Sequence, residues 1–370
     1  MKKLVLVFAF SYLIIVGYSQ VDNKAYSEAF KLIEAWLESQ KDYEMLPSIS
    51  SAVAKDQDVL WISSFGLANI ESNNKAEPKT LYSICSISKM FTSIAIMQLY
   101  DEGKIRLDDR IDNLLPWYDL EQQYPESGPI TIRSLLTHSS GLPREANFPY
   151  WTGPDFLFPS SDMVRSELSK QKTLYPASTH FQYSNLGFTL LGEIVEEISG
   201  ITYEEYISNN ILIPLGLNDT RTSLLKSLYG DKLAKGYSTK NRLGVREPTE
   251  FFQANGITSA AGLCSNVLDL VKFASWQLRL IEASSPEILK PSTLKYMHRI
   301  HLTDPEITFA APYWKTSWGL GFFVLEDSDG YKYVGHSGHC PGYKSIIILN
   351  PDSKLAISVM INASGTSPYK

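Results

Sequence analysis

Apolar positions near the start of the chain recur first with the period of a helix and then with the pattern of strands. In residues 25–40, AYSEAFKLIEAWLESQ, the side chains of Phe30, Ile33 and Leu37 fall on one face, which predicts an amphipathic helix. Two β-rich segments follow, near residues 48–53 and 59–65. The polar KDQD between them predicts a hairpin turn.

The segment from about residue 86 to 103 is apolar on most sides of a predicted helix. Gly103 follows its last periodic position and is a typical helix stop. Because so little of its surface is polar, we expect this helix to be buried. Its apolar positions are Ile87, Met90, Phe91, Ile94, Ala95, Ile96, Met97 and Leu99.

Helix and loop patterns continue to about residue 245, and the patterns of a helix and then of strands follow. The middle region contains TIRSLLTHSSGLP, a loop rich in proline and aromatic residues through Pro159, and an amphipathic stretch at 186–198. Ser265 is the predicted N-cap of a helix that runs to about Ala283. Three strands, separated by the turns DSDG and NPDSK, are predicted at residues 318–325, 343–349 and 355–361.

The two ends of the chain therefore supply strands, and the middle supplies helices. We predict a two-lobed α/β (α+β) fold, with an antiparallel sheet flanked by helices and interrupted by an inserted all-helical lobe. The α/β lobe takes about residues 20–85 and 255–370, and the helical lobe about residues 86–254. We expect a cleft between the lobes.

Composition and the first residues place this fold in an exported protein. The 370 residues are 44% hydrophobic and 12% aromatic, which is enough to bury a large core. Residues 1–19 are typical of a signal peptide: Lys2 and Lys3, an apolar run too short to span a bilayer, and small residues before the cleavage point. We expect a periplasmic or secreted protein without stable membrane insertion after cleavage. A retained anchor or a buried first helix is the alternative.

Charge limits the kinds of partner. Removing residues 1–19 takes away two lysines and no acid, so the formal net charge moves from -6 to -8. An acidic chain argues against a nucleic acid or an anionic membrane as partner. We therefore expect a small-molecule or short-peptide substrate, and the sequence specifies no oligomeric state.

Three cysteines, Cys85, Cys264 and Cys340, make an odd count for an exported chain. Disulfide-stapled folds usually have an even set of cysteines, so we expect no disulfide framework and at most one pair. Cys85 adjoins Ser86, and we expect it to be a small buried filler and not a second nucleophile.

The buried helix at residue 86 gives a common pattern a chemical meaning. Serine followed three residues later by lysine occurs at Ser72, Ser86, Ser169, Ser223, Ser292 and Ser367. Only Ser86 begins a buried helix, on which Lys89 lies one turn away on the same face. Burial and a helix N-terminus both lower a lysine pKa, so Lys89 can accept the serine proton. The alternative is an N-cap serine and a surface ion pair.

Two further motifs accompany SISK. FQYSNLGF supplies Tyr183 and Asn185, and YVGHSGHC supplies His336, Ser337 and Gly338 just before a predicted strand. In this order the motifs resemble the serine β-lactamases and penicillin-binding-protein-like hydrolases, in particular the branch of class C β-lactamases, DD-peptidases and esterases. TIRSLLTHSSGLP and SAAGLCS extend the resemblance from about residue 47 to the C-terminus.

The resemblance implies a role for each motif residue. Ser86 is the expected nucleophile, Lys89 and Tyr183 share the proton transfers, and Asn185 positions the substrate amide or the lysine. The reaction is acyl transfer through an acyl-enzyme that water hydrolyses. Without the resemblance, Tyr183 would be a packed aromatic and Asn185 a helix N-cap.

The third motif is expected to form the inner edge of the site. His336, Ser337 and Gly338 line that edge, and the backbone N–H groups of His339 and Ser86 form the oxyanion hole. Related β-lactamases and DD-peptidases usually begin this motif with lysine, but in this chain it begins with His336. The nearby KTS at residues 315–317 does not serve as the third motif, because it lacks the glycine.

The presence of His336 in place of lysine affects which substrates we expect the site to bind. An unperturbed histidine near pKa 6.5 is mostly neutral at pH 7, so we expect weak attraction for anionic substrates. We predict a secreted serine hydrolase that cleaves an ester or amide bond, esterase- or peptidase-like. The alternatives are a β-lactamase or D-alanyl-D-alanine carboxypeptidase, and a non-catalytic cell-wall-binding or scaffold relative.

A metal site is the remaining catalytic alternative, and we expect neither a metal nor another cofactor. In a strand, His336 and His339 point to opposite faces and chelate poorly. HRIH lacks the acidic residue that zinc hydrolases place between their histidines.

The loop GLPREANFPYWTGPDFLFP is predicted to form a stiff apolar wall at the rim of the cleft. Tyr150 and Trp151 would then contact the acyl chain of a substrate. The alternative is a loop that only packs on the helical lobe.

Overall fold

The computed structural model describes residues 23–223, 232–303 and 315–366. The predicted signal peptide, residues 1–19, lies outside the described residues. No helix in the described ranges is both long and apolar enough to cross a membrane.

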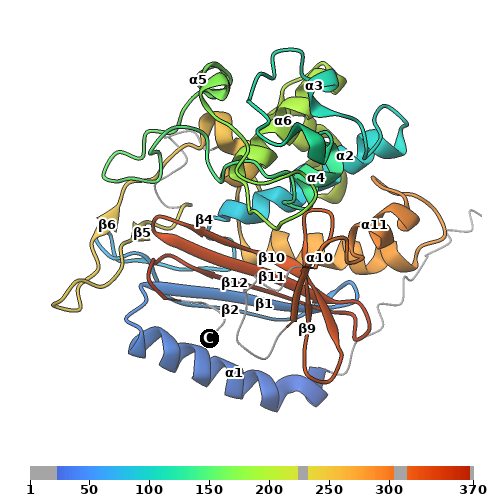
Figure 1. The fold of residues 1–370 in the computed structure, drawn as a ribbon. Coiled ribbons are helices and arrows are strands. Elements are labelled where there is room, and N and C mark those ends of the chain that lie inside the picture. The colour runs from blue at the N-terminus through green and yellow to red at the C-terminus, as the bar shows by residue number, and fades with distance from the viewer. Residues whose placement is uncertain (1–22, 224–231, 304–314, 367–370) are drawn as a thin grey trace, which may run out of the picture.

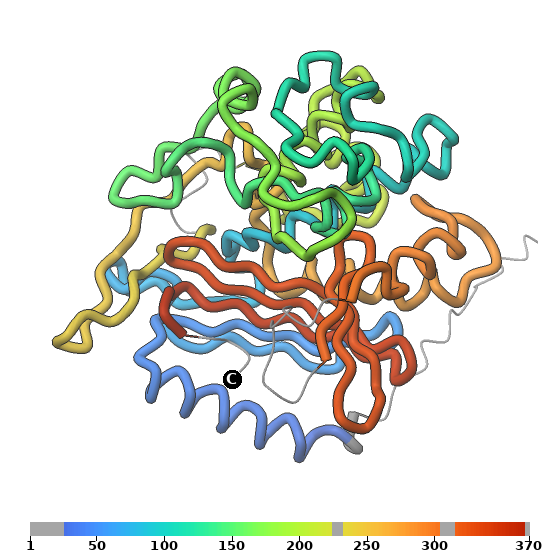
Figure 2. The backbone as a smooth tube through the Cα atoms, in the orientation of Figure 1, coloured from blue at the N-terminus to red at the C-terminus, as the bar shows by residue number. Residues whose placement is uncertain are grey.

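An antiparallel sheet of eight strands forms one layer of the molecule, in the order β3-β2-β1-β12-β11-β10-β9-β8 (Figure 1). Its centre joins the two ends of the chain, because β1 pairs with β12 from Ile49 opposite Ile361 to Lys55 opposite Leu355. Figure 2 shows this as blue N-terminal strands beside red C-terminal strands. The strands are β1 Ser48–Lys55, β2 Asp58–Asn69, β3 Asn74–Lys75, β8 Lys315–Trp318, β9 Phe323–Glu326, β10 Lys332–Cys340, β11 Tyr343–Asn350 and β12 Leu355–Ile361.

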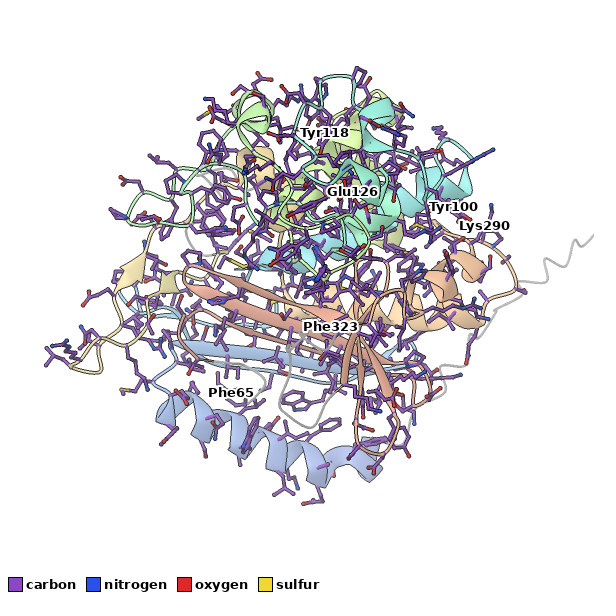
Figure 3. All side chains as sticks on the ribbon, in the orientation of Figure 1. Phe65, Tyr100, Tyr118, Glu126, Lys290 and Phe323 are labelled. Atoms are coloured by element: carbon purple, nitrogen blue, oxygen red, sulfur yellow. A yellow bond between two sulfur atoms is a disulfide. The ribbon has the colours of Figure 1, made fainter. Side chains whose placement is uncertain are left out.

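Helix α1, Asn23–Tyr43, packs along one face of the sheet (Figure 1). Phe30 stacks on Trp61 of β2 with ring centroids 5.7 Å apart, and the indole N–H of Trp61 donates to Glu34 at 2.8 Å. Phe65, labelled in Figure 3 on this side of the sheet, packs on the same apolar cluster as Leu37. The predicted amphipathic helix therefore buries its apolar face against the predicted hairpin, and both are confirmed.

The opposite face carries α10, Val267–Glu282, which packs on β1, β11 and β12, and beyond it the helical region (Figure 1). The predicted fold class, an antiparallel sheet flanked by helices, is confirmed. In the described ranges, the other α-helices of four or more residues are α2 Ser88–Asp101, α3 Ile111–Leu114, α4 Ile132–Leu136, α5 Ser161–Glu167, α6 Asn185–Ser199, α7 Tyr203–Ile207, α9 Thr258–Ala261 and α11 Pro291–Met297.

Smaller elements complete the fold. The short strands β4 Tyr82–Ser83 and β7 Cys264–Ser265 pair with each other, as do β5 Gly236–Tyr237 and β6 Pro248–Thr249. A 3-10 turn at Cys85–Ile87 leads directly into α2, and the short helix α8, Ile213–Leu215, ends at Gly216.

The buried helix predicted from residue 86 is α2, and every residue from Ser88 to Leu99 is buried. Gly103 has a φ of +74°, a left-handed conformation that glycine adopts without strain. It follows the end of the helix, as predicted.

Three details near the C-terminus differ from the prediction. The strand expected at residues 318–325 is two strands, because Gly319 and Gly321 turn the apolar run back on itself and Gly321 has a φ of +80°. The N-cap of α10 is Asn266, whose side chain accepts from the backbone of Asp269, since Ser265 is already paired in β7.

The third difference concerns the third motif. His336, Ser337 and Gly338 come before β11, Tyr343–Asn350, as predicted, but they also lie inside a strand of their own, β10, which was not predicted. The sequence KYVGHSGHC has few apolar residues, and β10 is held by its two neighbours in the sheet: β9 pairs with its first half and β11 with its second.

Candidate active site

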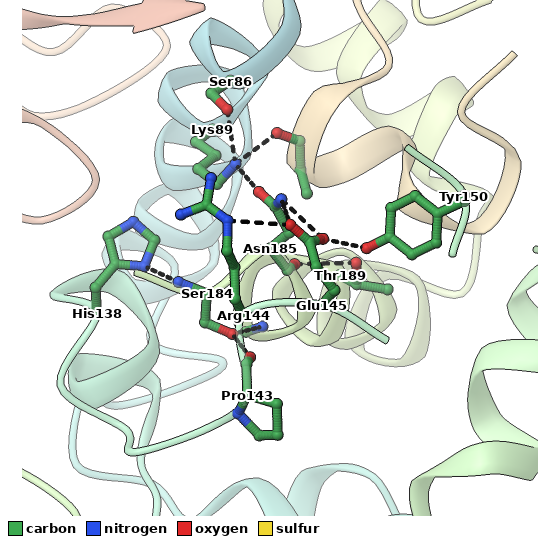
Figure 4. A network of polar contacts seen from close by, with 12 residues as sticks. Ser86, Lys89, His138, Pro143, Arg144, Glu145, Tyr150, Ser184, Asn185 and Thr189 are labelled. Atoms are coloured by element: carbon green, nitrogen blue, oxygen red, sulfur yellow. Dashed lines mark hydrogen bonds and ion pairs between the residues drawn. The ribbon is translucent and has the colours of Figure 1, made fainter. Parts of the chain in front are cut away.

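Ser86 lies in the 3-10 turn at the N-terminal end of α2, and Lys89 lies one turn further along the same face. Lys89 is fully buried, and its Nζ is 3.3 Å from Ser86 Oγ. Two oxygens complete its surroundings, Asn185 Oδ1 at 2.7 Å and the carbonyl of Ala260 at 2.7 Å (Figure 4). Three separate segments therefore meet at this one amine.

The burial of Lys89 lowers the pKa of its amine well below the ordinary value, and nearby Arg144 adds to this, whereas Glu145 opposes it. A neutral amine has two hydrogens and one lone pair. The oxygens of Asn185 and Ala260 accept both hydrogens, so the lone pair is left for the hydroxyl of Ser86. Lys89 is thus placed to remove the Ser86 proton.

Tyr183 stands beside this pair. Burial raises the pKa of its phenol, and a hydrogen bond with Ser86 opposes the rise. Lys89 Nζ lies 4.9 Å from the ring centroid of Tyr183. Because the phenol stays protonated near neutral pH, it can donate a proton, while the neutral amine is the stronger base of the two.

Asn185 is the first residue of α6, and its neighbour Ser184 caps the helix by accepting from the backbone of Gly187 at 2.8 Å. The side chain of Asn185 is therefore free to enter the site, and the alternative of Asn185 as an N-cap is wrong. Its amide nitrogen donates to both carboxylate oxygens of Glu145, at 2.8 and 2.9 Å.

Glu145 and Tyr150 extend this network outward (Figure 4), and neither was a predicted catalytic residue. The hydroxyl of Tyr150 donates to Glu145, and burial and the nearby carboxylate raise the pKa of that hydroxyl. Tyr150 is completely buried, so the prediction that it lines the substrate wall is wrong for this residue. The loop that follows the SGLP motif was the only sequence signal for these positions.

His138, in the same LLTHSSGLP motif, supports the site from behind. Its ring stacks on Tyr183 at 4.2 Å, and its Nδ1 accepts from the backbone N–H of Ser184 at 3.1 Å. Burial lowers the pKa of His138 well below the usual range, so it remains a neutral acceptor. Sequence reasoning named the motif but not this residue.

His336 differs most from the prediction. It is only 1% exposed and packs against Tyr183, Trp318 and Phe323. Burial lowers its pKa to about 3, so it is neutral at any pH at which the protein would act. The expectation of an unperturbed histidine that titrates near pH 6.5 is wrong, because the ring lies in the core and not at the cavity surface.

Gly338 explains why the third motif contains a glycine. A Cβ atom there would lie 2.0 Å from the carbonyl oxygen of Ile84, in the turn that carries Ser86. β10 thus approaches the turn that carries Ser86 more closely than a side chain would allow. Ser337 is also buried, whereas His339 is exposed and faces the cavity.

A cavity of about 590 Å³ opens at Ser86. Trp151 and Phe156 supply apolar lining, so the predicted wall has a basis in these two residues. The full lining is Ser86, Arg144, Glu145, Trp151, Phe156, Asn185, Ser238, Thr239, Thr249, His339, Cys340, Pro341, Ser364 and Gly365.

A disulfide joins Cys85 to Cys340, with their Cα atoms 5.9 Å apart. It connects the residue before Ser86 to the residue after His339, on two segments that are 255 residues apart in the chain. Cys264 is buried and free, so one pair forms, within the limit expected from the count. The expectation that Cys85 is a simple filler is wrong, because Cys85 forms this disulfide. The sequence did not indicate the pair, since it depends on the tertiary fold.

Comparison with known proteins identifies the family of the chain. The family model described as Beta-lactamase matches residues 33–370. The chain belongs to the β-lactamase family. Membership agrees with the resemblance carried by the SISK, tyrosine-asparagine and histidine-serine-glycine motifs.

Individual relatives are distant. Protein flp of Staphylococcus aureus strain COL is 28% identical over 322 residues, which are 86% of this chain and 60% of that protein. The chain therefore spans about three fifths of the length of this curated relative.

Solved structures share the fold. The octameric penicillin-binding protein homologue of Pyrococcus abyssi is 30% identical, with a TM-score of 0.78, over 92% of this chain and 74% of that one. EstCE1, a hydrolase with promiscuous acyltransferase activity, is 21% identical, with a TM-score of 0.77, over 92% and 95%. At that identity, the second likeness shows the fold alone.

Substituting Gly338 tests the close approach of β10. We expect Gly338→Ala to slow acylation of Ser86 by about 100-fold, because displacing the catalytic turn by an ångström is enough for such a loss. The rate of labelling by a fluorophosphonate probe measures it. Gly187→Ala is the control, since its added methyl meets nothing closer than 3.4 Å. Wild-type labelling in folded Gly338→Ala would contradict this interpretation.

Substituting Glu145 tests the network behind Lys89. The carboxylate raises the pKa of Lys89, and Lys89 acts only when neutral, so Glu145→Gln should move the rising limb of the pH–rate profile to lower pH. We also expect the maximal rate to fall about tenfold, because a glutamine amide cannot accept the Asn185 donor through both atoms. Glu167→Gln is the control, because this carboxylate bonds to Lys170 and Asn147 and not to Lys89 or Asn185. An unshifted profile would show that Glu145 does not act on Lys89.

Proposed function

We propose that the protein is an exported serine hydrolase that cleaves an ester or amide bond through an acyl-enzyme on Ser86. One observation carries the proposal: Lys89 is fully buried, its Nζ lies 3.3 Å from Ser86 Oγ, and burial lowers the pKa of its amine well below the ordinary value. Family membership supports the same class of chemistry.

The reaction follows from the positions of the groups. Lys89 takes the proton of Ser86, and the serine oxygen attacks the carbonyl carbon of the substrate. The backbone N–H groups of Ser86 and His339 stabilise the oxyanion, a role taken from the family resemblance. As the tetrahedral intermediate collapses, the proton passes to the leaving group through Lys89 and Tyr183. Water then attacks the acyl-enzyme, and the same groups transfer its proton.

The cavity suggests what kinds of substrate fit. Its volume of about 590 Å³ accommodates a small acyl group or a short peptide, with Trp151 and Phe156 on its apolar side. An esterase- or peptidase-like hydrolase is therefore our first choice among family activities. No metal or other cofactor takes part in the proposed steps.

Export is supported by two independent features. Residues 1–19 have the pattern of a signal peptide. The Cys85–Cys340 disulfide is of a kind that persists in oxidising compartments and is rare in the cytosol. We therefore propose a periplasmic or secreted location.

Two substitutions test the mechanism. Ser86→Ala should abolish labelling by a fluorophosphonate probe and leave the fold intact, because the side chain loses a single oxygen. Lys89→Ala should lower kcat by at least about 100-fold with a small change in KM, since a general base acts in the transition state.

Intact-mass spectrometry measures the covalent adduct, and a panel of p-nitrophenyl esters and D-alanyl amides measures turnover. Full labelling of the Ser86→Ala protein would refute the nucleophile. A Lys89→Ala protein with altered KM alone would refute the base.

A further inference from the structure

Arg144 brings a permanent positive charge to the cavity, and no motif predicts it. Its guanidinium carbon lies 4.9 Å from the ring centroid of Tyr183, and the residue lines the cavity together with Ser86. Among the cavity-lining residues in the described ranges, Arg144 is the one lysine or arginine. Figure 4 shows its guanidinium beside the end of Lys89.

The donors of Arg144 are largely available. Its Nε lies 3.2 Å from Glu145 Oε1, and 61% of the side chain is exposed. No hydrogen bond from the two terminal nitrogens to a described residue is present. A guanidinium whose two terminal NH2 groups bond to no described residue is well suited to bind a carboxylate through two parallel hydrogen bonds.

Neighbouring charges leave this role to Arg144. Glu145 accepts hydrogen bonds from Asn185 and Tyr150, so its carboxylate is already engaged. Burial lowers the pKa of Lys89 well below its ordinary value, and burial together with Lys344 and Arg144 lowers the pKa of His339. His336, where relatives carry a lysine, faces the core. An anionic group in the cavity therefore meets one fixed cation, Arg144, whose Nε pairs with the neighbouring carboxylate of Glu145 while its terminal nitrogens remain for a ligand.

The position of Arg144 also indicates which part of the substrate it meets. The groups that take the proton from Ser86 return it to the leaving group, so the leaving group lies close to Lys89 and Tyr183. Arg144 packs over Tyr183 and is therefore on the leaving-group side of the scissile bond.

We propose that Arg144 is a specificity-determining residue that binds a carboxylate on the leaving group of the substrate. The inference rests on the proposed acyl transfer at Ser86 and names the substrate class of that site. It replaces the expectation, drawn from His336, that the site attracts anions weakly. The positive charge that the third motif lacks is supplied by the loop after the SGLP motif.

A matched pair of compounds tests the proposal: an acyl thioester with a mercaptoacetate leaving group, and the methyl ester of the same compound. Each is added before a fluorophosphonate probe, and the concentration that half-protects Ser86 is measured by intact mass. We expect the wild-type protein to prefer the carboxylate, and Arg144→Gln to lower that preference at least about tenfold. Arg144→Lys should restore part of it, since it keeps the charge but loses the paired donors.

Lys344→Gln is the control, because it removes a nearby positive charge that does not line the cavity. It should change the preference little. Equal protection of the wild-type protein by the two compounds would overturn the proposal. So would an Arg144→Gln protein that loses protection by both compounds in proportion, because Arg144 would then act only through Lys89 and Tyr183. Failure of the proposed function looks different: the wild-type protein would show no Ser86-dependent labelling at all.

Discussion

The burial of Lys89 is the constraint on which the rest of the site depends. An amine without exposure to water is stable in the interior only if it is neutral or fully paired. Here two oxygens, from α6 and from the segment at Ala260, accept its hydrogens, and Ser86 lies at its third position. The same arrangement that makes a buried lysine tolerable directs its Nζ toward the hydroxyl of Ser86, the pair that we propose as base and nucleophile. The contacts that stabilise the buried amine are therefore the same contacts that orient it toward Ser86.

The surroundings of Lys89 hold two parts of the molecule in register. The turn at Ser86 packs closely on β10 because Gly338 has no side chain. The Cys85–Cys340 disulfide links the same two segments. From the other side, Glu145 orients Asn185, and His138 supports Tyr183. Because β10 belongs to a sheet built from both ends of the chain, the geometry of the site depends on the complete fold.

Local patterns were sufficient for much of this account. Helix α2 and its buried lysine were predictable from an unbroken apolar surface, and the central strands from their turns. Strand β10 was missed because its pairing with β9 and β11, and not its composition, makes it a strand. The core position of His336, the Cys85–Cys340 pair and the Glu145 network were missed for a related reason. Each depends on contacts between residues far apart in the sequence, and the periodicity of apolar residues does not predict such contacts.

The protonation state of Lys89 tests the central claim most directly. The protein can be prepared with lysine labelled with carbon-13 at Cε, and the signal of Lys89 identified by its loss in Lys89→Met. Its chemical shift is then followed by NMR as the pH is raised. The account predicts that Lys89 titrates well below the ordinary lysine value of 10.5, so that it is neutral when the other lysines are still charged. A signal that titrates together with the surface lysines would contradict it.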